Sequence, residues 1–253
     1  MNQFDLPDID AEFGGGFNAQ GYIPARPVNV YKAGVDLGRA VDSTAICILR
    51  KQQLPLDVIP NDAENNALSI DPRTMKQKLG PAKIFVELIQ RLPLKISFRE
   101  QAAMIRALSL TEPYCSAKTE CICDRTGVGS GVVELIEDTG LYPTKVVITS
   151  GRNTGSDDDG SLTVPKGELM ASLMAAFANR QLRISPALKD YKEFMKQMKA
   201  MQAGFSATGQ MTYNGAAGVH DDYVAAAALA LYRLNPPRLG SRVSVGDLSD
   251  FIS

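Results

Sequence analysis

The sequence predicts an α/β fold in which a mixed β-sheet is flanked by helices. The first observation is that short β-branched segments alternate with longer segments of helical period through most of the chain. The second is that the segments 30–36 and 43–50 follow one another with only the turn-like LGRAVD between them, which predicts a hairpin. An initial hairpin followed by alternating strands and helices indicates a sheet with both strand directions.

The remaining elements follow in order along the chain. Further strands are predicted from short apolar runs at 82–89, 119–124, 145–149 and 181–185. Helices are predicted from helical apolar spacing and end signals at 97–108, 131–140, 164–180, 186–202 and 220–234. The first of these helices begins with the capping box Ser97-x-x-Glu100, and Gly140 stops the second. Pro165 is expected near the first turn of the third helix.

Polar segments separate these elements and define the expected domain boundaries. The residues 55–81 form a polar insertion, 150–161 are expected to be a flexible solvated loop, and 204–215 have the pattern of a hairpin. The Gly-rich residues 1–28 are predicted to be a flexible tail, and 236–253 a second tail that begins at a Pro-Pro break. One domain is therefore expected over 29–235.

The composition is that of a globular protein and excludes several classes. The chain has 253 residues, of which 45% are hydrophobic, and a formal net charge of −1, which argues against a strongly basic nucleic-acid binder but leaves room for a local basic face. Its four cysteines suit neither a disulfide framework nor a zinc site, and Cys121 and Cys123 are expected to be buried thiols in a reducing compartment. No segment predicts a membrane span or a signal peptide.

Acidic residues stand at three comparable places. Asp36 ends the first strand, Asp124 ends the strand at 119–124, and Asp221 and Asp222 begin the last helix. Ligand sites in α/β sheets lie beyond the carboxyl ends of the strands, so these side chains are expected to converge there. Asp is also a common helix cap, and the capping role is the alternative for the pair at the helix start.

Converging carboxylates repel one another unless a cation lies between them. Hard oxygen ligands without matching His or Cys residues favour Mg²⁺ or Mn²⁺ over zinc. Two such ions can activate a water and stabilise the leaving oxygen in phosphodiester hydrolysis. The segment DRTGVGSG that contains Asp124 lacks the Lys of a Walker A loop, so it is not an ATP-binding motif of that type.

Four segments in this order resemble the nuclease domain of phage large terminase subunits, which has a ribonuclease H-like fold. They are GVDLGRAVDSTAICIL, CICDRTGVGSGVVELI, VPKGELMASLMAAFANRQLRIS and GVHDDYVAAAALALY, and the resemblance covers about 30–234. It implies that Asp36, Asp124 and Asp221 or Asp222 are catalytic and hold two metal ions. Of the last pair only one is expected to face the metals, because successive helix residues point about 100° apart; Asp221 is the favoured ligand.

The resemblance also implies a role and partners. It implies cleavage of double-stranded viral DNA during genome packaging, in the cytoplasm of a bacterial host. A typical large terminase carries an ATPase motor before its nuclease, whereas this chain begins with a short tail. Either the motor is a separate polypeptide, acting with a small terminase or portal protein, or the nuclease is used differently.

Three accessory residues are also candidates. Asp42 is either a second acid near the site or a turn residue, and His220 either contacts the scissile phosphate or faces solvent. Lys166 stands in a first helical turn, where a cation is unfavourable, so it is a candidate phosphate contact; a solvated lysine is the alternative.

The helix at 186–202 carries a basic stripe on one side and apolar residues on the other. The stripe consists of residues three or four apart: Lys189, Lys192, Lys196 and Lys199. It would contact a DNA backbone or form an ordinary solvated face.

Two other functions remain open. GVDLGRAVDSTAICIL is also similar to the first phosphate loop of sugar-kinase and actin-like ATPase domains, although such proteins enclose a nucleotide between two domains. The third possibility is a catalytically inactive DNA-binding or assembly protein that keeps the fold.

Overall fold

The computed structural model describes residues 18, 20–38, 43–59, 66, 68–127, 129–151, 153–205, 211–215 and 220–235. The chain divides into two compact units. The first comprises Met1–Asn29 and Gln52–Lys83, and the second Val30–Lys51 and Ile84–Ser253. In the first unit Ile23 pairs with Lys76 in an isolated bridge, and the Ala25 amide donates to the Gln77 side chain at 3.0 Å.

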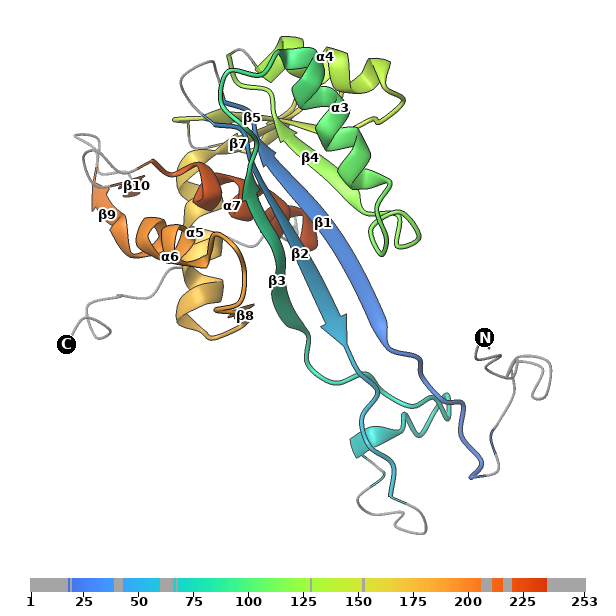
Figure 1. Ribbon diagram of the computed structural model, residues 1–253. Helices are drawn as coiled ribbons and strands as arrows, with labels where there is room; N and C mark the ends of the chain where they lie inside the picture. Colours follow the sequence, from blue (N-terminus) through green and yellow to red (C-terminus); the bar gives the residue numbers. More distant parts are fainter. Residues whose placement is uncertain are drawn as a thin grey trace. The chain divides into compact units, whose positions relative to one another are not determined.

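The sheet is mixed, as the sequence predicts. Its strands are β1 (Val28–Asp36), β2 (Ala45–Gln53), β3 (Lys83–Arg91), β4 (Glu120–Asp124), β5 (Thr144–Thr149), β6 (Gly155–Ser156), β7 (Leu162–Pro165) and β8 (Leu182–Ile184), in the order β6-β7-β5-β4-β1-β2-β3-β8. The pairs β1–β4, β4–β5, β5–β7 and β3–β8 are parallel, and β6–β7 is antiparallel. Strand β2 runs opposite to β1, which confirms the initial hairpin (Figure 1).

Helices cover both faces of this sheet, and alternate residues of each strand meet different helices. Ile46 and Ile48 pack with α3 (Phe98–Ser109) and α4 (Gly129–Asp138). Ala45, Cys47 and Leu49 belong to the core of the other face, with α5 (Lys166–Ala178), α6 (Tyr191–Ala200) and α7 (Asp222–Leu234). No helix in the described part of the chain is long and apolar enough to cross a membrane.

Three expectations about element boundaries are corrected. The residues 162–165 form strand β7, because Val164 is fully buried and the segment pairs with β5; α5 therefore begins at Lys166, with Pro165 at its N-cap. The loop expected at 150–161 contains β6 and a turn in which the Asp157 amide donates to the Ser161 carbonyl at 2.8 Å. Helix α6 ends at Ala200, and Met201 starts the predicted hairpin of β9 (Met201–Phe205) and β10 (Met211–Gly215).

Helix α7 packs so closely on β1 that one position of the strand admits only glycine. A Cβ atom at Gly34 would lie 2.0 Å from the Ala226 carbonyl oxygen and 2.8 Å from the Ala230 amide nitrogen. Both of these atoms belong to the helix backbone, which cannot rotate away as a side chain can. The Ala-rich sequence of α7 is the matching feature, because small side chains allow the helix axis to approach the sheet.

We expect Gly34→Ala to destabilise the protein by about 1–3 kcal/mol, the usual cost of overpacking a core. Gly131→Ala is the matched control, since a Cβ there meets nothing within 4 Å and lies in helix α4, where Ala is favoured over Gly by roughly 0.5–1 kcal/mol. Urea unfolding of both variants measures the difference. Equal stabilities would contradict the close approach of α7 and β1.

Candidate active site

The register of β1 against β4 brings two of the predicted acids together. The parallel ladder pairs Gly34 with Ile122 and Val35 with Cys123, so the next residues along the two strands are Asp36 and Asp124. Parallel neighbours end at the same edge of a sheet, where ligands bind in α/β folds. The predicted meeting of these acids required their strands to be adjacent, and the pairing of β1 with β4 meets that requirement.

The Asp124 carboxylate is held by the turn that follows it. Its Oδ1 atom accepts hydrogen bonds from the Thr126 amide at 2.8 Å and from the Thr126 hydroxyl at 2.5 Å. The Thr126 hydroxyl oxygen in turn accepts a bond from the Ile148 amide at 2.9 Å, which ties the turn to β5. These bonds engage one carboxylate oxygen only.

Lys166 and Asp221 meet at this same edge. Lys166 directly follows β7, which runs parallel to β5, and β5 runs parallel to β4, so Lys166 lies at the same end of the sheet as Asp124. The Lys166 ammonium donates to Asp221 Oδ2 at 2.7 Å. Their side chains are 40% and 31% exposed, so this ion pair is open to solvent.

Asp222 has quite different partners from its neighbour. Its two oxygens accept bonds from Arg91 at the end of β3, Nε to Oδ2 at 2.6 Å and Nη2 to Oδ1 at 2.8 Å. The amide of Gln197, on α6, donates to Oδ1 at 2.6 Å. The Asp222 side chain is 13% exposed. Most of this side chain is therefore withdrawn from solvent, and both of its oxygens are engaged by Arg91 and Gln197.

The acids repel one another electrostatically, and Asp36 is affected most. Burial raises the pKa of Asp36 from 3.8 to about 8, and the negative charges of Asp124, Asp221 and Asp222 act in the same direction, against the opposing charge of Lys166. Burial also raises the pKa of Asp124, although its bonds from Thr126 oppose this. At Asp222 burial acts in the same direction, but the hydrogen bonds from Arg91 and Gln197 outweigh it and hold the pKa below its usual value.

The donor set fits a hard divalent cation in its chemistry. Asp36, Asp124 and Asp221 supply carboxylate oxygens, the ligands that Mg²⁺ and Mn²⁺ prefer. Among the described residues, no three His, Cys, Asp or Glu side chains already stand close enough together to hold an ion. Asp221 is engaged by Lys166, so a cation shared with the strand acids would replace the lysine as its partner.

The remaining predicted accessory residues and the predicted lysine stripe lie outside the cluster of acids or outside the described residues. His220 is exposed and directly precedes the N-cap residue of α7, and Asp42 lies outside the described residues. All four lysines of the predicted stripe, Lys189, Lys192, Lys196 and Lys199, are exposed. The predicted helix start at 186 was wrong, because α6 begins at Tyr191; Lys189 therefore lies in the turn before the helix, and only the other three lysines are on it. The opposite side of α6 is buried through Phe194 and Met198, so the amphipathic pattern of this helix is confirmed.

Sequence reasoning missed the residues that hold the acids. Arg91 and Gln197 occupy ordinary positions of a strand and a helix, and no local motif distinguishes them. Thr126 could have been found, because a Thr two residues after an Asp is a common turn in which the carboxylate accepts the backbone amide.

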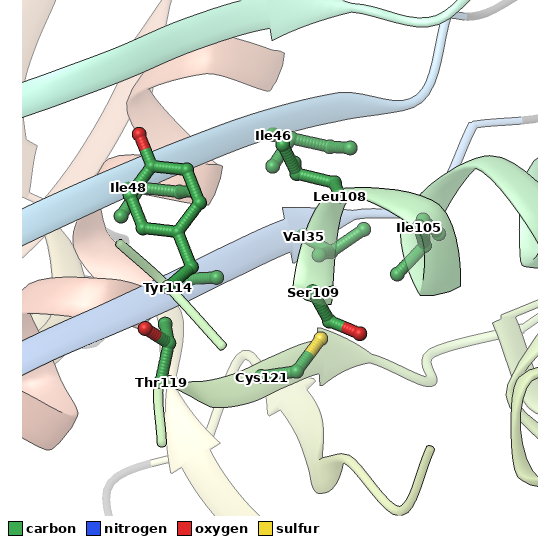
Figure 2. A pocket seen from close by; sticks show the side chains of 10 residues that line it. Val35, Ile46, Ile48, Ile105, Leu108, Ser109, Tyr114, Thr119 and Cys121 are labelled. Atoms are coloured by element: carbon green, nitrogen blue, oxygen red, sulfur yellow. The ribbon is translucent and has the colours of Figure 1, made fainter. Parts of the chain in front are cut away.

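A cavity elsewhere in the second unit does not compete with this acidic edge as a site for phosphodiester chemistry. It lies between the sheet and α3, and Figure 2 shows the side chains that line it. The lining is largely apolar, with Val35, Ile46, Ile48 and Ile105 among its members, and it contains no carboxylate. Without a carboxylate, such a lining is a poor site for a hard divalent cation.

The mixed sheet with helices on both faces defines a ribonuclease H-like α/β fold, and comparison with solved structures confirms it as the fold of phage large terminase nuclease domains. The nuclease of thermophilic phage G20c with bound magnesium matches with a TM-score of 0.50 at 18% identity, over 86% of this chain and 90% of that one. Its structure with bound cobalt matches with a TM-score of 0.50 at 17% identity over the same shares. No family model and no curated protein matches the sequence.

The raised pKa of Asp36 predicts how stability depends on pH in the metal-free protein. Its stabilising contribution is fully present below the unfolded pKa near 3.8 and is lost as the pH rises towards the folded value of about 8. Asp36→Asn removes this loss. We therefore expect the variant to melt higher than the wild type at pH 8 in EDTA, by about 2 °C or more.

Thermal melts of both proteins from pH 4 to pH 9 test this, and the advantage of the variant should shrink towards pH 4. A variant that melts at or below the wild type at pH 8 would show that Asp36 carries no such strain.

Proposed function

We propose that the protein is a divalent-metal-dependent DNA endonuclease that uses a two-metal mechanism. The observation that carries the proposal is the placement of Asp36, Asp124 and Asp221 at one edge of the sheet, where burial and the charges of the other two acids raise the pKa of Asp36 to about 8. Carboxylates crowded in this way are stabilised by a cation, and oxygen ligands favour Mg²⁺ or Mn²⁺.

Each residue has a defined part in this proposal. Asp36, Asp124 and Asp221 would hold the ions, which supply an activated water and stabilise the leaving oxygen in phosphodiester hydrolysis. Lys166 balances the acids while no ion is bound, through its 2.7 Å bond to Asp221. Once released from Asp221, its ammonium is placed to contact a phosphate of the substrate. His220 and Asp42 are proposed as accessory residues on the sequence pattern alone.

The fold supports DNA as the substrate, since it matches the large terminase nuclease of phage G20c, which has been solved both with magnesium and with cobalt. By the same likeness we propose cleavage of concatemeric viral DNA during genome packaging, in the cytoplasm of a bacterial host. The proposed partners are double-stranded DNA and an ATPase motor, together with a small terminase or portal protein.

The exposed lysines of α6, together with Lys189 just before it, are the proposed contact with the DNA backbone. Lys189, Lys192, Lys196 and Lys199 are all exposed, and of these Lys196 has an acidic neighbour, Glu193, at 3.6 Å. A surface pair of this kind contributes little, so it does not prevent the lysine from meeting phosphates. The stripe would explain how a protein of net charge −1 holds a polyanion.

We expect the wild type to nick or cut plasmid DNA in Mn²⁺ or Mg²⁺ with little sequence preference. Asp36→Asn and Asp124→Asn should each reduce cleavage by about 100-fold or more, because each removes a charged oxygen ligand. Asp138→Asn, at an exposed acid near the end of α4, is the control and should leave cleavage unchanged. Circular dichroism verifies that the variants are folded.

The same preparation separates the alternative functions. ATP hydrolysis without DNA cleavage would favour the sugar-kinase or actin-like class. DNA binding without either activity would favour an inactive binding or assembly protein. Full cleavage by Asp36→Asn or Asp124→Asn would contradict the two-metal site.

Replacing Lys192 and Lys196 by Ala should weaken DNA binding to a similar degree for all sequences. The slope of log affinity against log salt concentration should become shallower by about 2, one for each phosphate that a lysine no longer neutralises. Replacing Lys76 and Lys83, exposed lysines outside α6, is the control with the same change of charge. Fluorescence anisotropy over a salt series measures both; an unchanged slope would make the stripe an ordinary solvated face.

A further inference from the structure

Helix α7 is capped in an unusual manner. The first turn of a helix leaves backbone amides without partners, and an Asp at the N-cap normally accepts one of them. Asp221 occupies the N-cap of α7, but its side chain makes no cap hydrogen bond. The acceptor is instead Gln197 Oε1, which receives the Tyr223 amide at 3.0 Å and the Val224 amide at 3.4 Å.

Gln197 is fixed in this position from its other end. It lies on α6 and is 1% exposed, and its amide nitrogen donates to Asp222 Oδ1 at 2.6 Å. Arg91 holds both oxygens of Asp222, and its guanidinium also lies 4.5 Å from the centre of the Tyr223 ring. The amide of Gln197 therefore cannot turn over without placing its donor against the amides of α7 and its acceptor against a carboxylate.

The Tyr223 side chain extends the same connection. Its hydroxyl donates to Asp190 Oδ2 at 2.7 Å, and Asp190 is the residue that precedes α6. Hydrogen bonds from Gln197 within α6 and from Asp190 at its N-cap thus reach the first turn of α7. The helix that bears the exposed lysines is tied directly to the residues next to Asp221.

We propose that Gln197 caps α7 from outside and that Asp222 and Arg91 are positioning residues that hold Gln197 there, so that Asp221 does not cap its own helix and its carboxylate is presented to the acidic site. The part of the inference that concerns a bound ion rests on the proposed function. Asp222 is then not a metal ligand, because its oxygens are occupied by Arg91 and Gln197.

The physical reason lies in competition for Asp221. The carboxylate can accept the free amides of its own first turn or the Lys166 ammonium at the edge of the sheet, which lie in different directions. With Gln197 on the amides, only the second choice is left, and the 2.7 Å bond to Lys166 is the result. Without Gln197, these amides lose that acceptor, and Asp221, which occupies the N-cap, is the residue expected to take its place and turn away from Asp36 and Asp124.

Binding of Mn²⁺ alone to the full chain, followed by electron paramagnetic resonance, tests these roles. Asp221→Asn should abolish the tight binding, whereas Gln197→Ala and Asp222→Asn should each weaken it by about tenfold, the size typical of residues that orient a ligand. The double variant Arg91→Gln/Asp222→Asn should bind Mn²⁺ no more weakly than Asp222→Asn, because both substitutions remove the same interaction, the ion pair between Arg91 and Asp222. A folded Asp222→Asn protein that fails to bind Mn²⁺ as completely as Asp221→Asn would overturn the proposal, as would unchanged affinity in Gln197→Ala.

Amide hydrogen exchange tests the cap without any metal. Gln197→Ala should speed exchange at the Tyr223 and Val224 amides, while Gln181→Ala, at an exposed glutamine after α5, should not. Unchanged exchange in Gln197→Ala would refute the external cap. A wild type that neither binds Mn²⁺ nor cleaves DNA, but shows the exchange effect, would refute the proposed function and leave the cap standing, so the two failures are distinguishable.

Discussion

The burial of α7 against β1 is the constraint on which the candidate site depends. Every residue of α7 from Tyr223 to Tyr232 is buried, as is Leu234. At Gly34 the backbone of α7 comes so close to β1 that a Cβ atom added there would lie 2.0 Å from a helix carbonyl oxygen. A helix held this tightly has a fixed start. Its first residues therefore lie at the edge of the sheet where β1 and β4 end.

The charges at this edge are divided between two environments. On one side Asp36, Asp124 and Asp221 lie near the ammonium of Lys166, and burial together with the neighbouring carboxylates raises the pKa of Asp36. On the other side Asp222 is compensated by the guanidinium of Arg91 and by Gln197. The adjacent residues Asp221 and Asp222 therefore lie in different electrostatic surroundings, although their side chains are identical. The cluster of three acids around one lysine suits cation binding, whereas Asp222, whose charge is balanced by Arg91, suits a structural role.

Several features of the site were predictable because they follow from local patterns. Strand segments that end in Asp and helix segments that begin with Asp are visible in sequence, and the rule for the carboxyl ends of parallel strands places Asp36 and Asp124 together. Strand β7 was missed because four residues ending in Pro give too short a pattern, and its identity comes from pairing with β5. The end of α6 was missed for a related reason, since the hairpin partner of Met201 lies well beyond it along the chain, at Gly215.

The sequence alone determined the α/β class, the acids at the ends of β1 and β4, the buried character of α7 and the exposed stripe of α6. These follow from periods of two and 3.6 residues and from turn chemistry, all of which are local. The tertiary structure alone decided the difference between Asp221 and Asp222. Their partners, Lys166, Arg91 and Gln197, come from three other elements of the fold. Which partner each carboxylate meets depends on how those elements pack, and no pattern within the segment HDD contains that information.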